Sequence, residues 1–198
     1  MNRTAELFDG QRVMLILRGF SVERSVELAE RAWDLGIELV EVPVQSERGF
    51  AALAAVIEAA RDRGRSVGAG TVVSEEHMSR VAAAGATFAV SPGLDLALVR
   101  AAEEHGLAYL PGVGTATEVQ LAAGAGLTHL KGFPASVLGP DWFRAMRGPF
   151  PDITFVATGG IDAANAPRFL DAGVAAVAVG SAIEDEAQLP LIAGLVRA

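Results

Sequence analysis

The sequence of 198 residues contains no cysteine and a single lysine, Lys131, against fifteen arginines. Without cysteine the chain has no disulfide and no thiolate metal site, which fits a reducing compartment such as the cytoplasm. Basic residues are outnumbered by acidic ones, and a net charge of −8 argues against a nucleic-acid or membrane partner, which would need a basic face. Long apolar runs and an export signal are also missing. We therefore expect a cytoplasmic protein that binds small molecules or copies of itself.

Hydrophobic residues make up 51% of the chain, and no linker interrupts it, so residues 1–198 are predicted to form one domain. Eight short apolar runs alternate with segments of helical periodicity, and these runs are residues 13–17, 37–44, 66–72, 87–91, 108–113, 128–133, 153–158 and 175–180. Eight such units favour an α/β fold of the (β/α)8 TIM-barrel type over an open doubly wound sheet. The first ten residues are expected to add a helix that covers the barrel floor.

Three polar side chains are predicted to meet at the mouth of this barrel. Alternate residues of a barrel strand point inward, and chemistry collects where the strands end. By this alternation, Arg18 on the first strand, Glu41 on the second and Lys131 on the sixth all point inward. Their positions near the carboxyl ends of these strands predict a shared site.

Lys131 lies in an apolar run, where an unpaired ammonium is costly to bury. Arginine forms ion pairs equally well, but its guanidinium cannot lose a proton or condense with a carbonyl. We therefore interpret Lys131 as a Schiff-base nucleophile and Glu41 as the general acid/base beside it. Phe133 and Pro92 would supply apolar walls. The alternative is a buried ion pair whose lysine survived an arginine-rich composition by chance.

Small residues follow the last two predicted strands. Gly159 and Gly160 follow the seventh strand, and Gly180 and Ser181 follow the eighth. Barrels commonly hold a phosphate at these two loops, on exposed backbone N–H groups. Either pair alone could form a tight turn, but together they predict a phosphorylated substrate.

Two other strand ends also consist of small residues, Gly-Ala-Gly-Thr at 68–71 and Ser-Pro-Gly at 91–93. These residues are expected to leave room for a ligand. A Gly-x-Gly pattern alone is a weak nucleotide signature, and the acidic residue of a dinucleotide site is missing. The three histidines are scattered without paired spacing. We therefore predict no metal and no cofactor.

In their order along the chain, these motifs resemble the 2-keto-3-deoxy-6-phosphogluconate/4-hydroxy-2-oxoglutarate (KDPG/KHG) aldolases, which are metal-independent class I lyases. The resemblance spans nearly the whole sequence, through residues 17–19, 40–43, 68–71, 91–93, 111–112, 130–134, 148–150, 158–160 and 180–181. Segments 17–19 and 41–46 are more similar to the 2-keto-3-deoxy-6-phosphogalactonate branch. Thr158 is more similar to the phosphogluconate branch.

The resemblance implies a role for each matching position. Lys131 would be the Schiff-base lysine, Glu41 the general acid/base working through water, and Thr71 a contact of the pyruvate carboxylate. The backbone of the two small-residue loops would bind the phosphate. Thr158 and Phe133 would line the space between the phosphate and the pyruvate carboxylate. A homotrimer is also implied.

One position departs from the pattern of the family. Many members carry a carboxylate-binding arginine where this chain has Gln45, which can only donate or accept hydrogen bonds. Arg18, inside the barrel at the end of the first strand, is the expected replacement, because its guanidinium can grip a carboxylate with two N–H groups.

The predicted function is that of a class I aldolase acting on a 2-keto-3-deoxy-6-phospho sugar acid of the gluconate or galactonate type. The products would be pyruvate and D-glyceraldehyde 3-phosphate, and 4-hydroxy-2-oxoglutarate is a further candidate substrate. Two alternatives stay open. One is a phosphate-binding barrel isomerase or synthase in which Lys131 only binds an anion, and the other is a non-catalytic trimeric barrel scaffold.

Overall fold

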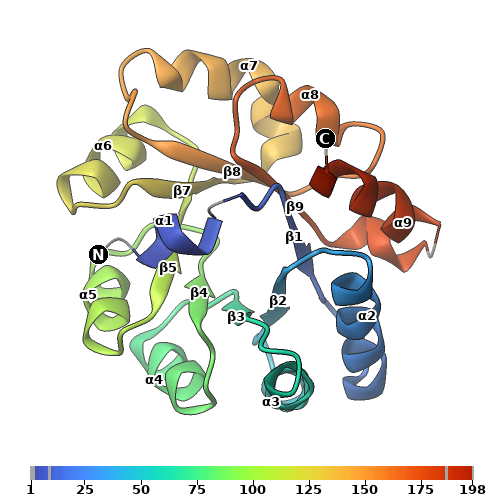
Figure 1. Ribbon diagram of the computed structural model, residues 1–198. Coiled ribbons are helices and arrows are strands. Elements are labelled where there is room, and N and C mark those ends of the chain that lie inside the picture. The colour runs from blue at the N-terminus through green and yellow to red at the C-terminus, as the bar shows by residue number, and fades with distance from the viewer. Residues whose placement is uncertain (1–2, 9, 186, 198) are drawn as a thin grey trace.

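The computed structural model describes residues 3–8, 10–185 and 187–197. Its strands are all parallel and follow the order β5-β4-β3-β2-β1-β9-β8-β7-β6 (Figure 1). Their bounds are β1 Val13–Ile16, β2 Leu39–Pro43, β3 Val67–Gly70, β4 Phe88–Val90, β5 Ala108–Leu110, β6 Gly112–Val113, β7 His129–Gly132, β8 Thr154–Thr158 and β9 Ala176–Val179. Each predicted apolar run therefore contains a strand.

The sheet forms a nearly closed barrel whose two edges meet at Pro111. This residue separates β5 from β6, because proline has no N–H for the strand ladder. β5 pairs with β4, whereas β6 pairs with β7, so the two ends of the strand order belong to one run of chain. The carbonyl of Pro111 accepts a hydrogen bond from the backbone N–H of Lys131 at 2.9 Å. The predicted eight-stranded barrel is therefore confirmed for the described residues.

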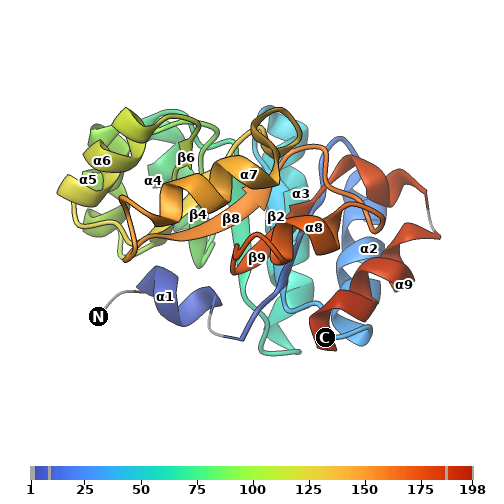
Figure 2. The ribbon, with the colours of Figure 1, turned by 90° about the horizontal axis from the view of Figure 1, so that it is seen from above.

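Apart from α1 Arg3–Phe8, the helices form a ring outside the barrel (Figures 1 and 2). Most begin at a side chain that caps the first turn, as Ser21 does by accepting a hydrogen bond from the backbone N–H of Arg24. No helix among the described residues is long and apolar enough to cross a bilayer. The helices are α1 Arg3–Phe8, α2 Val22–Asp34, α3 Glu47–Arg61, α4 Glu75–Ala83, α5 Leu96–Glu104, α6 Ala116–Gly124, α7 Ala135–Arg147, α8 Ala166–Leu170 and α9 Gln188–Ala193, with 3-10 helices η1 Ser181–Glu184 and η2 Gly194–Arg197.

Strand alternation divides the buried side chains into two layers. The layer between strands and helices includes Val40 and Val42 of β2. The smaller layer inside the barrel includes Leu39 of the same strand. Glu41 has the parity of Leu39, so its predicted inward direction is confirmed. The inner layer comprises Phe8, Met14, Ile16, Leu39, Phe88, Val90, Ala108, Leu110, Val156, Ala176 and Ala178.

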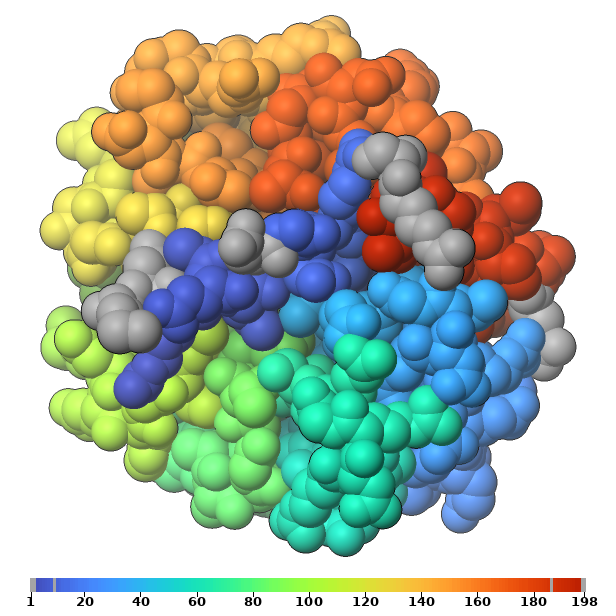
Figure 3. Space-filling model, viewed as in Figure 1, coloured from blue at the N-terminus to red at the C-terminus, as the bar shows by residue number. Residues whose placement is uncertain are grey.

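Helix α1 covers the amino-terminal ends of the strands, which are the floor of the barrel (Figures 2 and 3). Phe8 is 4% exposed, belongs to the inner layer and stacks on His129 with ring centroids 6.2 Å apart. The Thr4 hydroxyl donates to the carbonyl of Tyr109 and accepts from its backbone N–H, at 3.3 and 3.2 Å. The expected floor helix is therefore present.

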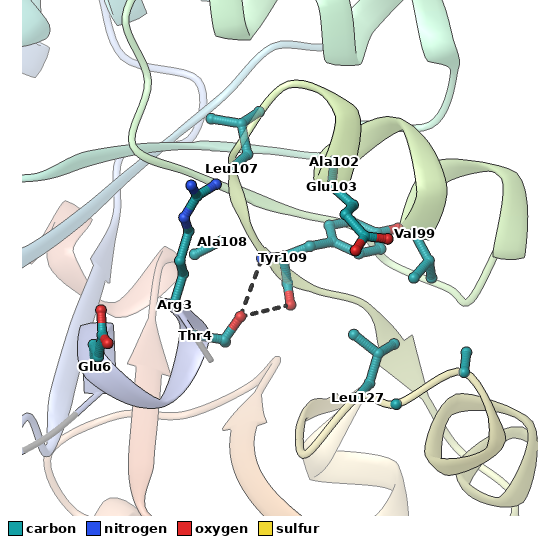
Figure 4. Close-up of a pocket in the computed structure, with 12 residues that line it drawn as sticks. Arg3, Thr4, Glu6, Val99, Ala102, Glu103, Leu107, Ala108, Tyr109 and Leu127 are labelled. Atoms are coloured by element: carbon teal, nitrogen blue, oxygen red, sulfur yellow. Dashed lines mark hydrogen bonds between the residues drawn. The ribbon is translucent and has the colours of Figure 1, made fainter. Parts of the chain in front are cut away.

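A hollow of about 760 Å³ lies beside α1 at this floor (Figure 4). Its lining includes Arg3 and Glu6 of α1, Glu103 of α5 and Leu127 before β7. These positions precede the strands or cover their starts, whereas Arg18, Glu41 and Lys131 lie toward the opposite ends of their strands. The hollow is therefore separate from the predicted site.

Candidate active site

The mouth of the barrel holds Glu41 of β2 and Lys131 of β7, which are 0% and 2% exposed. They are the only acidic and basic side chains that the described part of the chain buries this completely. Burying a charge is costly unless it is paired, and ordinary packing gives no reason to place two charges here. This pair is therefore the first candidate for chemistry.

Lys131 is held by the strands on both sides of β7. Its backbone pairs with Gly112 of β6 and Val156 of β8, and its Nζ lies 4.8 Å from the centroid of the Phe133 ring. Burial lowers the pKa of Lys131, the Glu41 carboxylate opposes this shift, and the Arg18 guanidinium adds to it. A lower pKa increases the fraction of neutral amine, which is the form that attacks a carbonyl.

Glu41 lies in the barrel without a direct partner. Neither carboxylate oxygen has a hydrogen bond within the described structure. Burial raises the pKa of this carboxyl, while the charges of Lys131 and Arg18 act in the opposite direction. Glu41 and Lys131 therefore interact through their charges without a direct hydrogen bond, and the choice between a buried ion pair and a catalytic pair stays open at this point. A carboxyl with a raised pKa and free oxygens can both give and take a proton.

Arg18 and Gln45 lie exposed at the rim, beyond the ends of β1 and β2. Arg18 acts electrostatically on both buried charges, so the structure brings it to the Glu41–Lys131 pair as predicted. The side chain of Gln45 makes no hydrogen bond to any described residue. The role of Arg18 as the replacement for a missing arginine stays a prediction.

Thr71, directly after β3, has a φ of 58° and is the one non-glycine residue with positive φ in the described chain. This left-handed conformation is unfavourable for a β-branched residue and costs about 1–3 kcal/mol. It also breaks the strand alternation. Val67 and Ala69 pack against the helices, so alternation would place residue 71 there as well, but Val72 takes that position in the outer core. The left-handed turn therefore keeps the half-buried Thr71 out of the outer core.

Phe133 and Thr158 lie at the ends of the paired strands β7 and β8, and Pro92 follows β4. Phe133 is half-buried and packs near Gly159, and the carbonyl of Pro92 lies against Gly112, the strand partner of Lys131. Thr158 has the inward parity of Val156, is 2% exposed, and its hydroxyl has no hydrogen-bond partner among the described residues. The structure thus brings the predicted wall residues to the mouth and adds a free hydroxyl there.

The two small-residue loops adjoin one another because β8 pairs with β9. Gly159 and Gly160 have φ values of 99° and 71°, which glycine adopts without strain. The backbone N–H groups of Gly160 and Ser181 donate no hydrogen bond to described residues, while Ser136 lies beside Gly160, where a Cβ would be 2.7 Å from its Oγ. The loops therefore offer the free amides that a phosphate requires. Ser136 was missed because only the three-dimensional fold brings it here.

The room that was expected at two glycines is filled by the chain itself. A side chain on Gly68 would overlap the Phe88 ring, and one on Gly70 would overlap the Glu41 carboxylate. These two glycines therefore make space for inward side chains rather than for a ligand, which corrects the prediction for Gly68 and Gly70. Ser91 was named only as part of a small-residue turn, yet its hydroxyl is buried in a hydrogen-bond chain with Tyr109.

A parallel (β/α)8 barrel with a buried lysine and a free buried carboxylate at its mouth defines a barrel enzyme able to use amine and acid/base chemistry. No group of three or more acidic or histidine side chains that could hold a metal ion occurs in the described residues. The family model of the KDPG and KHG aldolases matches residues 5–190. The chain therefore belongs to this aldolase family.

Three similar proteins illustrate the relationship. The 2-dehydro-3-deoxy-6-phosphogalactonate aldolase of Escherichia coli is 33% identical over 85% of this chain and 82% of its own. The 2-dehydro-3-deoxy-phosphogluconate aldolase of Pseudoalteromonas atlantica is 35% identical over 83% and 76%. A KDPG aldolase of Legionella pneumophila, solved with pyruvate captured as a covalent carbinolamine, is 32% identical over 99% of this chain and 97% of its own, with a TM-score of 0.85.

Proposed function

We propose that this aldolase cleaves a 2-keto-3-deoxy-6-phospho sugar acid of the gluconate or galactonate type into pyruvate and D-glyceraldehyde 3-phosphate. The observation that carries the proposal is the buried amine of Lys131 near a buried carboxyl whose oxygens have no partner among the described residues. Similar proteins that act on either of the two sugar types support the substrate class. 4-Hydroxy-2-oxoglutarate, which shares the pyruvate half, is a further proposed substrate.

In the proposed mechanism the neutral amine of Lys131 attacks the C2 ketone of the substrate. The resulting carbinolamine loses water and gives a protonated imine. Glu41, through a water molecule, takes the proton of the C4 hydroxyl as the C3–C4 bond breaks. The electron pair of that bond enters the imine as an enamine, and the aldehyde leaves. Glu41 then returns a proton to C3, and water hydrolyses the imine to pyruvate and the free amine.

The other site residues would hold the two ends of the substrate. We assign the carboxylate to Thr71 and to the Arg18 guanidinium, with Gln45 at the rim beside them. The phosphate is assigned to the backbone of Gly159, Gly160, Gly180 and Ser181, since the amides of Gly160 and Ser181 have no acceptor within the described chain. Thr158, Phe133 and Pro92 would line the space between, where the unpartnered Thr158 hydroxyl can contact a substrate hydroxyl.

Borohydride trapping tests this assignment directly. The protein is incubated with pyruvate, reduced with borohydride, and digested for peptide mass spectrometry. Lys131 is the only lysine, so a pyruvate-derived adduct on a side-chain amine identifies this residue without ambiguity. We expect an adduct on the peptide that contains Lys131, and none in Lys131→Arg, which keeps the charge but cannot form an imine. An unmodified Lys131, or full activity of the arginine variant, would refute the mechanism.

Cleavage rates on the gluconate- and galactonate-derived epimers, measured side by side, identify the preferred substrate. We also propose the homotrimer that the family resemblance implies. Light scattering on the purified protein should then give three times the mass of the chain. A mass equal to one chain would contradict the trimer and leave the proposed reaction unaffected.

A further inference from the structure

A chain of buried hydrogen bonds runs from β5 to the backbone beside Thr71. The Tyr109 hydroxyl donates to Ser91 Oγ at 2.8 Å, and Ser91 Oγ donates to the carbonyl of Val72 at 2.5 Å. Tyr109 and Ser91 are 4% and 2% exposed, so water does not compete for these bonds. Ser91 has a single hydroxyl proton and donates it to the Val72 carbonyl. The Tyr109 hydroxyl must therefore be the donor in the bond between Tyr109 and Ser91.

Val72 is thereby fixed at both of its backbone groups. Its N–H donates to the carbonyl of Val90 at 3.1 Å, and its carbonyl accepts from Ser91. Its side chain is fully buried between the barrel and the helices. The residue directly before it is Thr71, whose unfavourable left-handed backbone persists only if its surroundings hold it there. The end of β4 supplies this restraint through Val90 and Ser91.

Tyr109 is suited to keep Ser91 in place. Burial raises the pKa of Tyr109 to about 12, so its hydroxyl stays protonated as a donor at neutral pH. The backbone of Tyr109 is in turn fixed by two hydrogen bonds to Thr4 of the floor helix. The restraint on Thr71 is thus linked through Tyr109 to the floor helix.

We propose that Ser91 is a positioning residue for the substrate carboxylate: it holds Val72, and through it the left-handed backbone of Thr71, while Tyr109 orients Ser91. This inference rests on the proposed function, in which Thr71 contacts the pyruvate carboxylate. Ser91 itself does not touch the substrate. Losing its hydroxyl frees the Val72 carbonyl and allows Thr71 to relax toward an ordinary conformation, which weakens pyruvate binding and leaves the phosphate loops unchanged.

The test measures the pyruvate concentration that gives half-maximal borohydride trapping, and separately the inhibition constant of inorganic phosphate. For Ser91→Ala we expect the half-saturating pyruvate concentration to rise about 3- to 10-fold, the range set by one buried hydrogen bond. Tyr109→Phe, which keeps the bond from Ser91 to Val72, should raise it about 2-fold. Inhibition by phosphate should be the same in all variants.

Ser25→Ala is the matched control. Ser25 is 1% exposed and its hydroxyl donates to the carbonyl of Ser21 at 2.8 Å, but it lies in α2, outside the barrel. Its loss should lower stability without changing the half-saturating pyruvate concentration. If Ser91→Ala does not fold, Tyr109→Phe replaces it, and its rise of about 2-fold should disappear in a Thr71→Ala background.

A double-mutant cycle shows whether Ser91 acts through Thr71. In a Thr71→Ala background, Ser91→Ala should change the half-saturating pyruvate concentration less than 2-fold, because the contact that it positions is already lost. An equal effect in both backgrounds, an unchanged concentration in Ser91→Ala, or an equal shift in the phosphate constant would overturn the inference. Absence of any trapped adduct in the unmodified protein would instead overturn the proposed function.

Discussion

The floor and the mouth of the barrel differ in whether their buried polar groups have hydrogen-bond partners. At the floor, both backbone groups of Tyr109 are paired with Thr4, and Phe8 fills the space between the strands. At the mouth, the Glu41 carboxylate and the Thr158 hydroxyl are buried without a partner in the described chain, and Thr71 adopts an unfavourable φ. The floor therefore stabilises the fold. The mouth keeps unpaired polar groups and a strained backbone, both of which lower stability.

Glu41→Gln should give the largest effect, because it removes a proton-transferring group from the mouth. We expect kcat for cleavage to fall about 10²- to 10⁴-fold, the usual contribution of a general acid or base. The variant should also be more stable than the unmodified protein at neutral pH, since a buried carboxylate without a partner opposes folding. Urea unfolding and steady-state kinetics measure the two effects. A less stable variant would mean that Glu41 is a structural partner.

The pH dependence of stability sharpens this prediction. The pKa of Glu41 is raised in the folded protein, above the value of about 4.3 in the unfolded chain. Between these two pKa values the folded state keeps a proton that the unfolded state has lost, so the contribution of Glu41 to the free energy of unfolding falls as pH rises. The stability gained in Glu41→Gln should therefore grow from about pH 4 upward. A constant difference would contradict the raised pKa.

Phe8→Ala tests the floor alone. Truncating this buried ring should lower the free energy of unfolding by about 3–5 kcal/mol, because it leaves a cavity in the inner layer. At a temperature where the variant is fully folded, kcat should stay within about 2-fold, since stability and catalysis are assigned to opposite ends. A large drop in kcat for the folded variant would show that the two ends are coupled.

Gly70→Ala should have a smaller effect, confined to the mouth. The added Cβ overlaps the Glu41 carboxylate and must displace it, so we expect kcat to fall about 10-fold, part of the general acid/base contribution. Gly124→Ala is the matched control, because a Cβ there meets nothing within 4 Å at the end of α6. It should leave kcat unchanged and raise stability by up to about 1 kcal/mol. Equal kinetics in both variants would show that Glu41 tolerates displacement.

Eight apolar runs separated by helical segments were enough to predict the barrel, and the alternation of residues along the strands directed Glu41 and Lys131 inward. It could not predict that Gly70 makes room for Glu41, because that contact depends on the register between β2 and β3. The conformation of Thr71 was also out of reach, since threonine does not favour positive φ and neighbouring strands impose it. Ser91 and Tyr109 are eighteen positions apart and meet only in the folded chain.

The burial of the only lysine has a practical consequence for chemical probing. Apart from the terminal amine, Lys131 is the one aliphatic amine in the chain, and it is 2% exposed. A small acylating reagent that labels a lysine therefore reports on the barrel mouth alone. Its labelling rate as a function of pH gives the titration curve of this amine, and protection by a bound molecule gives an occupancy assay that needs no turnover.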